Sequence, residues 1–324
     1  MELLINYSNA LTNRLEEAVR LKEPIQLYEP VKYILSLGGK RLRPVLTLMT
    51  ADFFGDGYEN AMNAALAVEL FHNFSLIHDD IMDHAPLRRG KETVHEKWDI
   101  NTGILSGDVM LILAYQLFEG YEPNLFKELA KLFSKTAVEV CEGQQYDVDF
   151  ETRDDVTISE YIKMIDYKTA VLVGAAMKIG AIVAGASESC KENIYEFGRN
   201  LGIAFQLQDD YLDAFGDPET FGKQVGGDII SNKKTFLYLT ACERAQAQDT
   251  ATLQHLFSVN PMDASDKIET VKGIFESSGA AQATVLEIER YTAKANSVLE
   301  KINLSEAQKG KFREFGEYLM KRTV

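Results

Sequence analysis

The stretch Phe71-His72-Asn73-Phe74-Ser75-Leu76-Ile77-His78-Asp79-Asp80-Ile81-Met82-Asp83 joins an apolar helical pattern to three aspartates. It closes a longer pattern, from Asn60 to Met82, in which apolar residues recur at the spacing of a helix that faces a core. Residues four apart lie on one helix face, so Asp79 and Asp83 are expected to project together, with Asp80 beside them. The stretch therefore predicts a buried helix that presents carboxylates near its C-terminal end.

A second aspartate group, Asp209-Asp210-Tyr211-Leu212-Asp213, follows another apolar approach, and Gln206 shares a face with Asp210. A single group of this kind is more often a solvated helix face or a cap. Two groups favour function, because clustered carboxylates repel one another unless a cation lies between them. Oxygen ligands suit Mg²⁺ or Mn²⁺ better than Zn²⁺, and Mg²⁺ usually binds one or two carboxylates together with substrate phosphates. The pair of groups therefore indicates metals that bridge a diphosphate.

Helical patterns also cover residues 126–150, 159–184 and 192–214, and the remainder from Thr235 onward is amphipathic and helical. The chain shows no linker composition and no block rich in strand-forming residues. We therefore predict an all-α protein, and its length suits one large domain or two smaller ones. A single domain over residues 1–324 is the choice that the family resemblance given below implies.

The 324 residues carry a net charge of −15, which disfavours nucleic acid and anionic membranes as partners. No apolar run approaches the roughly 20 residues of a membrane-spanning helix. The three cysteines, Cys141, Cys190 and Cys242, are scattered, which is typical of reduced thiols in a cytoplasmic protein.

Basic residues gather in several places that could meet an anionic substrate. Gly38-Gly39-Lys40-Arg41-Leu42-Arg43 is either a helix cap with basic residues or a diphosphate cradle. Arg88 and Arg89 either pair with the preceding aspartates or contact a diphosphate. Lys168, followed by Thr169, either extends along apolar surface or faces a polar cavity. The glycine-rich segment 215–235, with Lys223 and Lys233, is either a plain connection or an active-site flap.

Taken in order, these motifs resemble the trans-isoprenyl diphosphate synthases of the polyprenyl synthetase family. The resemblance rests on residues 38–44, 78–83, 88–90, 168–169 and 205–213, and on Gly222-Lys223 onward. It implies an all-α bundle around a central cavity, usually a homodimer, with Mg²⁺ or Mn²⁺ as cofactor. The implied reaction elongates an allylic diphosphate (dimethylallyl, geranyl or farnesyl) with isopentenyl diphosphate, head to tail. Glu92 and Ser231-Asn232 differ from the residues that are common at these positions in the family.

The resemblance also implies roles for individual residues. Asp79, Asp83 and Asp209 would hold the metals, with Asp80, Asp210 and Asp213 completing the two aspartate groups. Isopentenyl diphosphate would be bound by Lys40, Arg43, His72 and Arg89. The allylic diphosphate would be bound by Arg88, Lys168, Lys223 and Lys233, while Thr169 and Gln206 would stabilise the cation.

The length of the product is a steric question. Phe71 and Phe74, with Ser75 beside them, lie one to two turns before the first aspartates, where bulky residues would close the pocket floor. Ordinary core packing predicts the same aromatic residues. The expectation is a short product of 15 to 20 carbons (about three to four isoprene units).

Other classes predict different features. A His-Asp phosphohydrolase has no use for a second aspartate group, and a terpene cyclase usually lacks that group and the isopentenyl-binding cations. A non-catalytic subunit of a heterodimeric prenyl synthase would be expected to have lost aspartates, and this chain keeps all six.

Overall fold

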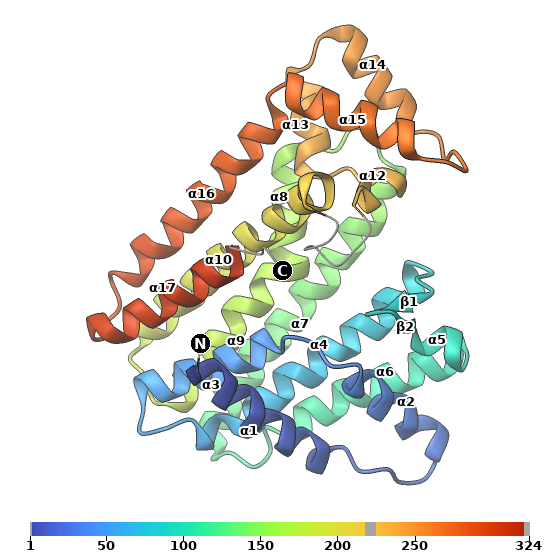
Figure 1. Ribbon diagram of the computed structural model, residues 1–324. Helices are drawn as coiled ribbons and strands as arrows, with labels where there is room; N and C mark the ends of the chain where they lie inside the picture. The colour runs from blue at the N-terminus through green and yellow to red at the C-terminus, as the bar shows by residue number, and fades with distance from the viewer. Residues whose placement is uncertain (1, 218–224, 321–324) are drawn as a thin grey trace. The chain divides into compact units, whose positions relative to one another are not determined.

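The computed structural model of the protein describes residues 2–217 and 225–320 (Figure 1). The predicted all-α fold is confirmed, because helices make up nearly all of the regular structure in these ranges. Residues 2–116 form α1 (Glu2–Ala18), α2 (Ile25–Ser36), α3 (Leu42–Phe54), the 3₁₀ turn η1 (Glu59–Ala61), α4 (Met62–Met82), α5 (Val94–Lys97) and α6 (Ile100–Gln116). A short antiparallel hairpin pairs β1 (Leu87–Arg88) with β2 (Lys91–Glu92), with Arg88 opposite Lys91.

The rest of the described chain is also helical. It comprises α7 (Pro123–Thr152), α8 (Ile158–Ile165), the π-helical segment η2 (Asp166–Ala170), α9 (Val171–Val183), α10 (Glu188–Phe215), α12 (Gly227–Ile230), α13 (Phe236–Arg244), α14 (Ala247–Leu256), α15 (Ser265–Ser277), α16 (Ala280–Leu299) and α17 (Glu306–Met320). The long helices predicted at 60–82, 126–150 and 192–214 correspond to α4, α7 and α10. The one predicted at 159–184 differs, since η2 interrupts it between α8 and α9.

The chain divides into two compact units. Unit 1 comprises Met1–Lys135 and Ala175–Tyr195, and unit 2 comprises Thr136–Gly174 and Glu196–Val324. The three boundaries between them fall inside α7, α9 and α10.

Unit 1 is organised around α4, which packs along α6 and α3. Two glycines of α6 allow the close approach. A side chain on Gly107 would overlap the ring of His78, and a Cβ on Gly103 would lie 2.9 Å from Cδ1 of Ile81. Because helix axes come closest where side chains are smallest, these glycines set the depth at which α4 lies. They therefore help to place the aspartates at its end.

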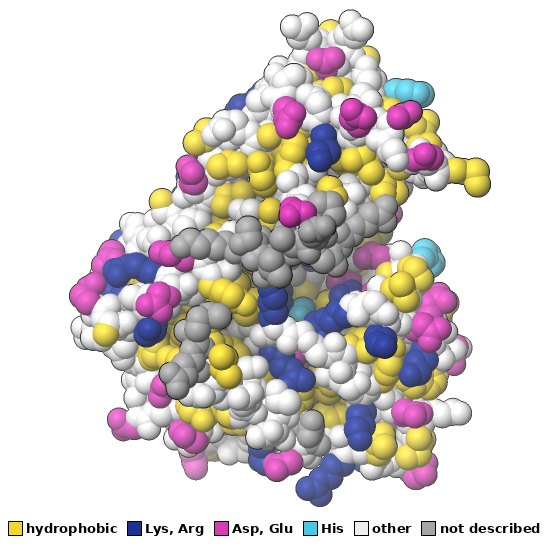
Figure 2. All heavy atoms as spheres, in the orientation of Figure 1, with side chains coloured by type: hydrophobic (Ala, Val, Ile, Leu, Met, Phe, Trp, Pro, Cys, Tyr) yellow, Lys and Arg dark blue, Asp and Glu magenta, His cyan; other side chains and the backbone are white. Residues whose placement is uncertain are grey.

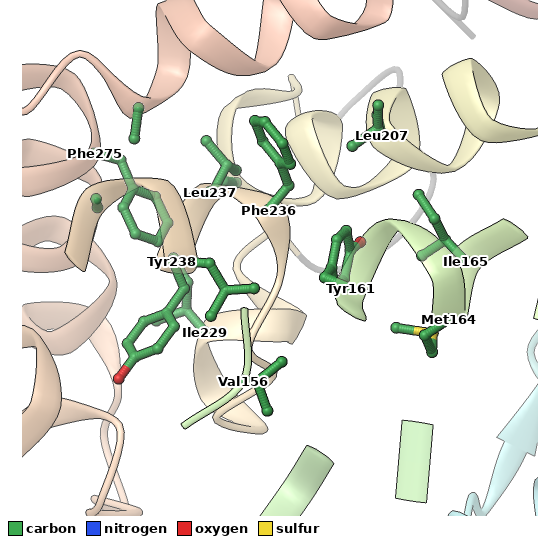
Figure 3. Packing of buried hydrophobic residues seen from close by; sticks show 14 of the residues in the cluster. Val156, Tyr161, Met164, Ile165, Leu207, Ile229, Phe236, Leu237, Tyr238 and Phe275 are labelled. Carbon is green, nitrogen blue, oxygen red and sulfur yellow. The ribbon is translucent and has the colours of Figure 1, made fainter. Parts of the chain in front are cut away.

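Unit 2 has a core of buried hydrophobic side chains from α8, α10, α13 and α15, among them Tyr161, Leu207, Phe236 and Phe275 (Figure 3). Burying such side chains is the main source of stability in a helical unit, at about 1.5–3 kcal/mol for each large apolar residue. This core fixes α8 and α10, which carry most of the polar residues discussed below for unit 2.

The π segment η2 lies against two glycines of neighbouring helices. A side chain on Gly143 of α7 would overlap the backbone nitrogen of Lys168, and a Cβ on Gly202 of α10 would lie 2.7 Å from Cα of Ala170. A π segment widens one helical turn and is frequent at functional sites. These contacts hold the widened turn at Lys168 and Thr169.

None of the helices in the described residues is long and apolar enough to cross a membrane. None of the three cysteines forms a disulfide within the described residues. Figure 2 shows charged side chains of both signs spread over the visible surface, with hydrophobic side chains between them.

Candidate functional site

The first aspartate group lies at the C-terminal end of α4. Asp80 is 2% exposed, and Arg88 donates to it from both Nε and Nη2, each 2.7 Å from a carboxylate oxygen. Asp79 is half-buried, and Asp83, directly after the last helical residue, is exposed. Of the two interpretations left open for Arg88, the ion pair is the one observed. Asp79 and Asp83 are the carboxylates of this group that reach solvent.

Basic side chains meet beside the turn that precedes α3. Arg43 donates from Nη1 to Nε2 of His72 over 3.2 Å, and Arg89 donates to the carbonyl of Gly38. Gly38 and Gly39 have φ of +76° and +124°, which glycine adopts without strain. A Cβ on Gly39 would lie 2.5 Å from the Arg89 guanidinium, so the glycine is needed for this approach. The turn thus joins two basic motifs that are about 50 residues apart in the chain.

Burial determines the charges in this cluster. Burial lowers the pKa of His72 well below its ordinary value, and the neighbouring guanidinium groups lower it further. A neutral imidazole can accept from Arg43, which only donates. Burial also lowers the pKa of Arg43 to about 10, against the opposing effect of Glu69. Glu69 is buried, accepts from Nδ2 of Asn73 over 3.0 Å, and counterbalances part of the arginine charge.

Asp210, in the second aspartate group, is enclosed by unit 2. It is 4% exposed, accepts from the hydroxyl of Tyr161, and accepts from Nε2 of Gln206 over 3.0 Å. Burial and the charge of Asp228 raise the pKa of Asp210 to about 7, although Tyr161, Lys233 and Gln206 oppose this shift. Asp210 is therefore the buried, hydrogen-bonded carboxylate of this group.

The other two aspartates of this group are more accessible. Asp209 and Asp213 are half-buried on α10. The backbone N–H of Asp228 donates to Oδ2 of Asp213 over 2.9 Å, and the N–H of Gly226 donates to the Asp213 carbonyl over 2.6 Å. These bonds fix the start of α12 to the end of α10. The carboxylates of Asp209 and Asp213 thus lie next to the point where α12 is hydrogen-bonded to α10.

Lysines of unit 2 converge on Asp147 of α7. Nζ of Lys168 donates to Oδ2 of Asp147 over 2.5 Å, and Nζ of Lys233 lies 3.9 Å from the same oxygen. Burial alone would raise the pKa of Asp147, but Lys233 and Lys168 outweigh it and lower that pKa. Thr169 donates to Oε1 of Gln206 over 3.3 Å, which joins this lysine group to the Asp210 group. The ammonium of Lys168 therefore ends at a polar partner rather than on apolar surface, and its place in a substrate cavity stays a prediction.

The residues predicted to limit product length lie on the buried side of α4. Phe71 is 1% and Phe74 8% exposed, and their ring centroids are 5.5 Å apart. The ring of Phe74 also lies 4.8 Å from that of His78, the residue directly before Asp79. Ser75 is half-buried and donates to the carbonyl of His72 over 2.9 Å. These positions do not distinguish a pocket floor from ordinary packing, so the steric role stays a prediction.

The substrate-binding roles of Lys40 and Lys223, and the metal site, stay predictions. Lys40 is exposed at the glycine turn of unit 1. Lys223 lies outside the described residues. Within residues 2–217 and 225–320, no three His, Cys, Asp or Glu side chains are grouped so that they could hold a metal ion. The assignment of Asp79, Asp83 and Asp209 to metal therefore stays a prediction.

Sequence reasoning missed four acidic or phenolic residues: Glu69, Asp147, Tyr161 and Asp228. Each is a counter-charge or hydrogen-bond partner of a predicted residue. The sequence contained a signal for Glu69, which is a lone carboxylate in an apolar helical run. It also contained one for Asp147, which lies four residues after Gly143 inside a long helix. Tyr161 gave no signal, because a tyrosine on an amphipathic helix is ordinary.

Comparison with known proteins identifies the class. The family model described as polyprenyl synthetase matches residues 24–274. A geranylgeranyl diphosphate synthase of Methanosarcina mazei is 42% identical over 246 residues, which is 75% of this chain and 76% of that protein. A geranylfarnesyl diphosphate synthase of Natronomonas pharaonis is 39% identical and covers 82% and 81% of the two chains. The chain belongs to the polyprenyl synthetase family.

A solved structure narrows the class further. The crystal structure of a geranylgeranyl pyrophosphate synthase has 55% sequence identity and a TM-score of 0.95, and the match covers 99% of each chain. The chain is a short-chain trans-isoprenyl diphosphate synthase, and therefore a prenyltransferase. These findings give no support to the cyclase, hydrolase or non-catalytic subunit considered from the sequence.

Replacing Asp147 by Asn removes the carboxylate that Lys168 and Lys233 share. Because that carboxylate is mostly buried and both lysines are partly exposed, we expect the free energy of unfolding at neutral pH to fall by about 1–3 kcal/mol. The pKa of Asp147 is lowered in the folded protein, so its stabilising effect exists above the ordinary carboxyl pKa and is lost as the pH falls through the lowered value.

The penalty should therefore shrink as denaturant unfolding is repeated down to a pH of about 3. Asp149→Asn is the matched control, since this exposed aspartate of the same helix accepts only from Gln145. A penalty for Asp147→Asn that stays constant over this pH range would contradict the ion-pair interpretation.

Proposed function

We propose that this enzyme transfers an allylic prenyl group to isopentenyl diphosphate, head to tail, and releases diphosphate. The observation that carries the proposal is that each unit has one aspartate group accompanied by its own cations. Unit 1 has Asp79 and Asp83 together with the arginines at 43, 88 and 89. Unit 2 has Asp209 together with Lys168 and Lys233. A reaction between two diphosphates needs positive charge for both substrates.

The residue roles follow from these two groups. Lys40, Arg43, His72 and Arg89 are proposed to bind isopentenyl diphosphate, supported by the contacts that join Arg43 to His72 and Arg89 to the glycine turn. A planar guanidinium can bind two phosphate oxygens at once, which suits a group that must be held in one orientation.

A different set is proposed to bind the allylic diphosphate: Arg88, Lys168, Lys223 and Lys233. The carboxylates of Asp80 and Asp147 hold Arg88, Lys168 and Lys233 before substrate arrives. An incoming diphosphate then meets side chains that these carboxylates already restrain, which lowers the reorganisation that binding requires.

Mg²⁺ or Mn²⁺ fits the donor set, because Asp79, Asp83 and Asp209 are half-buried or exposed carboxylates with no cysteine or histidine ligand among them. These three residues would hold it. When bound, the divalent ion supplies positive charge that stabilises the diphosphate as it leaves.

Bond changes balance within the two substrates. The allylic C–O bond breaks with its electron pair on diphosphate, the double bond of isopentenyl diphosphate attacks the resulting cation, and loss of a proton restores an alkene. Thr169 and Gln206 are proposed to stabilise the cation through their oxygens, and Lys168 and Lys233 to neutralise the departing diphosphate. The buried side chains of α4 would keep water from the cation.

An assay with isopentenyl diphosphate, Mg²⁺ and each of dimethylallyl, geranyl and farnesyl diphosphate tests this function. We expect elongation that stops on chelation and returns when Mg²⁺ is added. Asp79→Ala and Asp209→Ala should each reduce kcat by on the order of a hundredfold or more, since charge stabilisation is the main catalytic effect. Asp56→Ala, at an exposed aspartate in the turn after α3, should leave it unchanged. Diphosphate release without elongation would contradict the proposal.

We propose a product of 15 to 20 carbons, as in the sequence prediction, limited by Phe74 and Phe71. Phe74→Ala should lengthen the main product by one or more five-carbon units, measured by chromatography of the extracted prenyl alcohols. Truncating a buried phenylalanine costs about 3–5 kcal/mol, so the assay belongs at a temperature where the variant is folded. Phe118→Ala, another buried phenylalanine of unit 1, is the matched control. Equal product lengths in both variants would refute the steric role.

We further propose that the enzyme is a homodimer. Support comes from α6, which exposes Ile104, Leu105 and Ile112, each at least 40% accessible, on neighbouring turns. Exposed apolar side chains grouped on one face commonly mark an interface. Leu105→Glu combined with Ile112→Glu should yield monomers in light scattering, while Leu286→Glu, at a comparably exposed leucine on α16, should leave the dimer intact. A wild-type monomer would overturn this proposal.

A further inference from the structure

Asn232 forms a turn of unusual conformation between α12 and α13. Its φ is +60°, in the left-handed region that few residues other than glycine adopt. Both ends of its side chain are bound: Nδ2 donates to Oδ1 of Asn260 over 2.7 Å, and Oδ1 accepts from Nζ of Lys267 over 2.6 Å. The side chain therefore fixes this turn to α15 and to the segment before it.

Lys267 is a buried lysine that has no acidic partner among residues 2–217 and 225–320. It is 3% exposed, and its ammonium donates to Asn232 and, over 3.0 Å, to the carbonyl of Val259. Its remaining contact is with the ring of Phe257, 5.8 Å away. A buried ammonium among neutral partners is less favourable than an apolar side chain of the same length. Packing alone thus does not explain why a lysine occupies this position.

The segment that Lys267 holds carries two groups of the site. The N–H of Asp228 donates to the carboxylate of Asp213, and the N–H of Lys233 donates to the Asp228 carbonyl over 2.8 Å. Nζ of Lys233 lies 3.9 Å from Asp147, the carboxylate that also binds Lys168.

A second contact from α15 acts on the start of the same segment. Gly226 has φ of +84°, and a Cβ there would lie 2.9 Å from Cδ1 of Ile268, the residue after Lys267. Helix α15 thus restrains the segment at both of its ends.

We propose that Lys267 is a positioning residue for prenyl transfer, which holds Asn232 so that the following residue, Lys233, is presented to the allylic diphosphate. The inference rests on the proposed function, because it takes Lys233 as a ligand of that substrate. Lys267 itself touches no substrate and acts through one side-chain hydrogen bond.

Lys267→Met tests the proposal, since methionine fills nearly the same volume without the donor. We expect KM for the allylic diphosphate to rise about five- to tenfold, the usual effect of losing a hydrogen bond from a charged group, with KM for isopentenyl diphosphate within about twofold of wild type. Lys309→Met is the matched control, because Lys309 is another buried lysine of unit 2 that donates to a backbone carbonyl and contacts acids of its own region. Its two KM values should not change.

Variants at Asn232 separate the backbone from the side chain. Asn232→Gly keeps the left-handed turn but loses the acceptor, so it should raise the allylic KM as Lys267→Met does. Asn232→Asp keeps an acceptor for Lys267 but loses the donor to Asn260, so it should raise the allylic KM less than Asn232→Gly does. In the double variant Asn232→Gly, Lys267→Met, the effect should be no larger than that of the larger single change, because both remove the same Lys267 hydrogen bond.

The outcomes distinguish the positioning role of Lys267 from the proposed function on which it rests. An unchanged allylic KM in Lys267→Met, or effects that multiply in the double variant, would overturn the positioning role. Equal rises in both KM values, with a lower melting temperature, would also overturn it and assign Lys267 a purely structural role. Lys233→Ala with an unchanged allylic KM would instead show that the proposed function misplaces Lys233. Melting temperatures measured by circular dichroism verify that each variant is folded.

Discussion

The structure depends on one electrostatic constraint, which is that arginine and lysine side chains gathered in one place must be neutralised within the folded protein. Bare clusters of arginine and lysine would repel one another and lower the stability of the fold. The protein answers with a buried carboxylate for each cationic group: Asp80 for Arg88, Asp147 for Lys168 and Lys233, and Glu69 beside Arg43. These acids hold the neighbouring cations in place and partly shielded from water; in the proposed function, the diphosphates of the substrates would take over part of this role.

Close packing of backbones supplies the second requirement, which is rigidity around those charges. At Gly143 and Gly202 a helix backbone takes up space that a side chain would otherwise fill. The neighbouring helix then cannot slide without opening a void, and interiors resist voids strongly. The polar groups themselves lie on helix ends and turns, where hydrogen bonds such as those made by Asp213 and Asn232 set the backbone. Rigid helices thus carry residues whose final orientation is decided by short polar contacts.

The sequence was sufficient to predict the helical class and the long helices, because apolar spacing is a local property that survives in the folded chain. It also indicated the two aspartate groups at 79–83 and 209–213, whose metal-binding role stays a prediction. It could not predict that Asp80 turns inward to Arg88, nor that Asp147 lies between two lysines, since these pairs join residues 8 to 86 positions apart. The partners of a charge depend on how helices meet in space, which the periodicity of one helix does not encode. Tyr161 is the clearest case, since only its bond to Asp210 distinguishes it from other core aromatics.

The π segment has a consequence for helical phase. A regular helix advances about 100° per residue, so one residue accommodated in a wide turn shifts every later side chain by that angle relative to the earlier ones. A helical wheel drawn for 158–183 as one regular helix therefore assigns the residues of α9 to the wrong face relative to those of α8. Removing a single residue from Asp166–Ala170 would restore a regular helix with the buried faces of α8 and α9 still in phase, but it would remove the widened turn that carries Lys168 and Thr169. Lys168 and Thr169 are thus where they are because the chain contains one residue more than a regular helix of that length would hold.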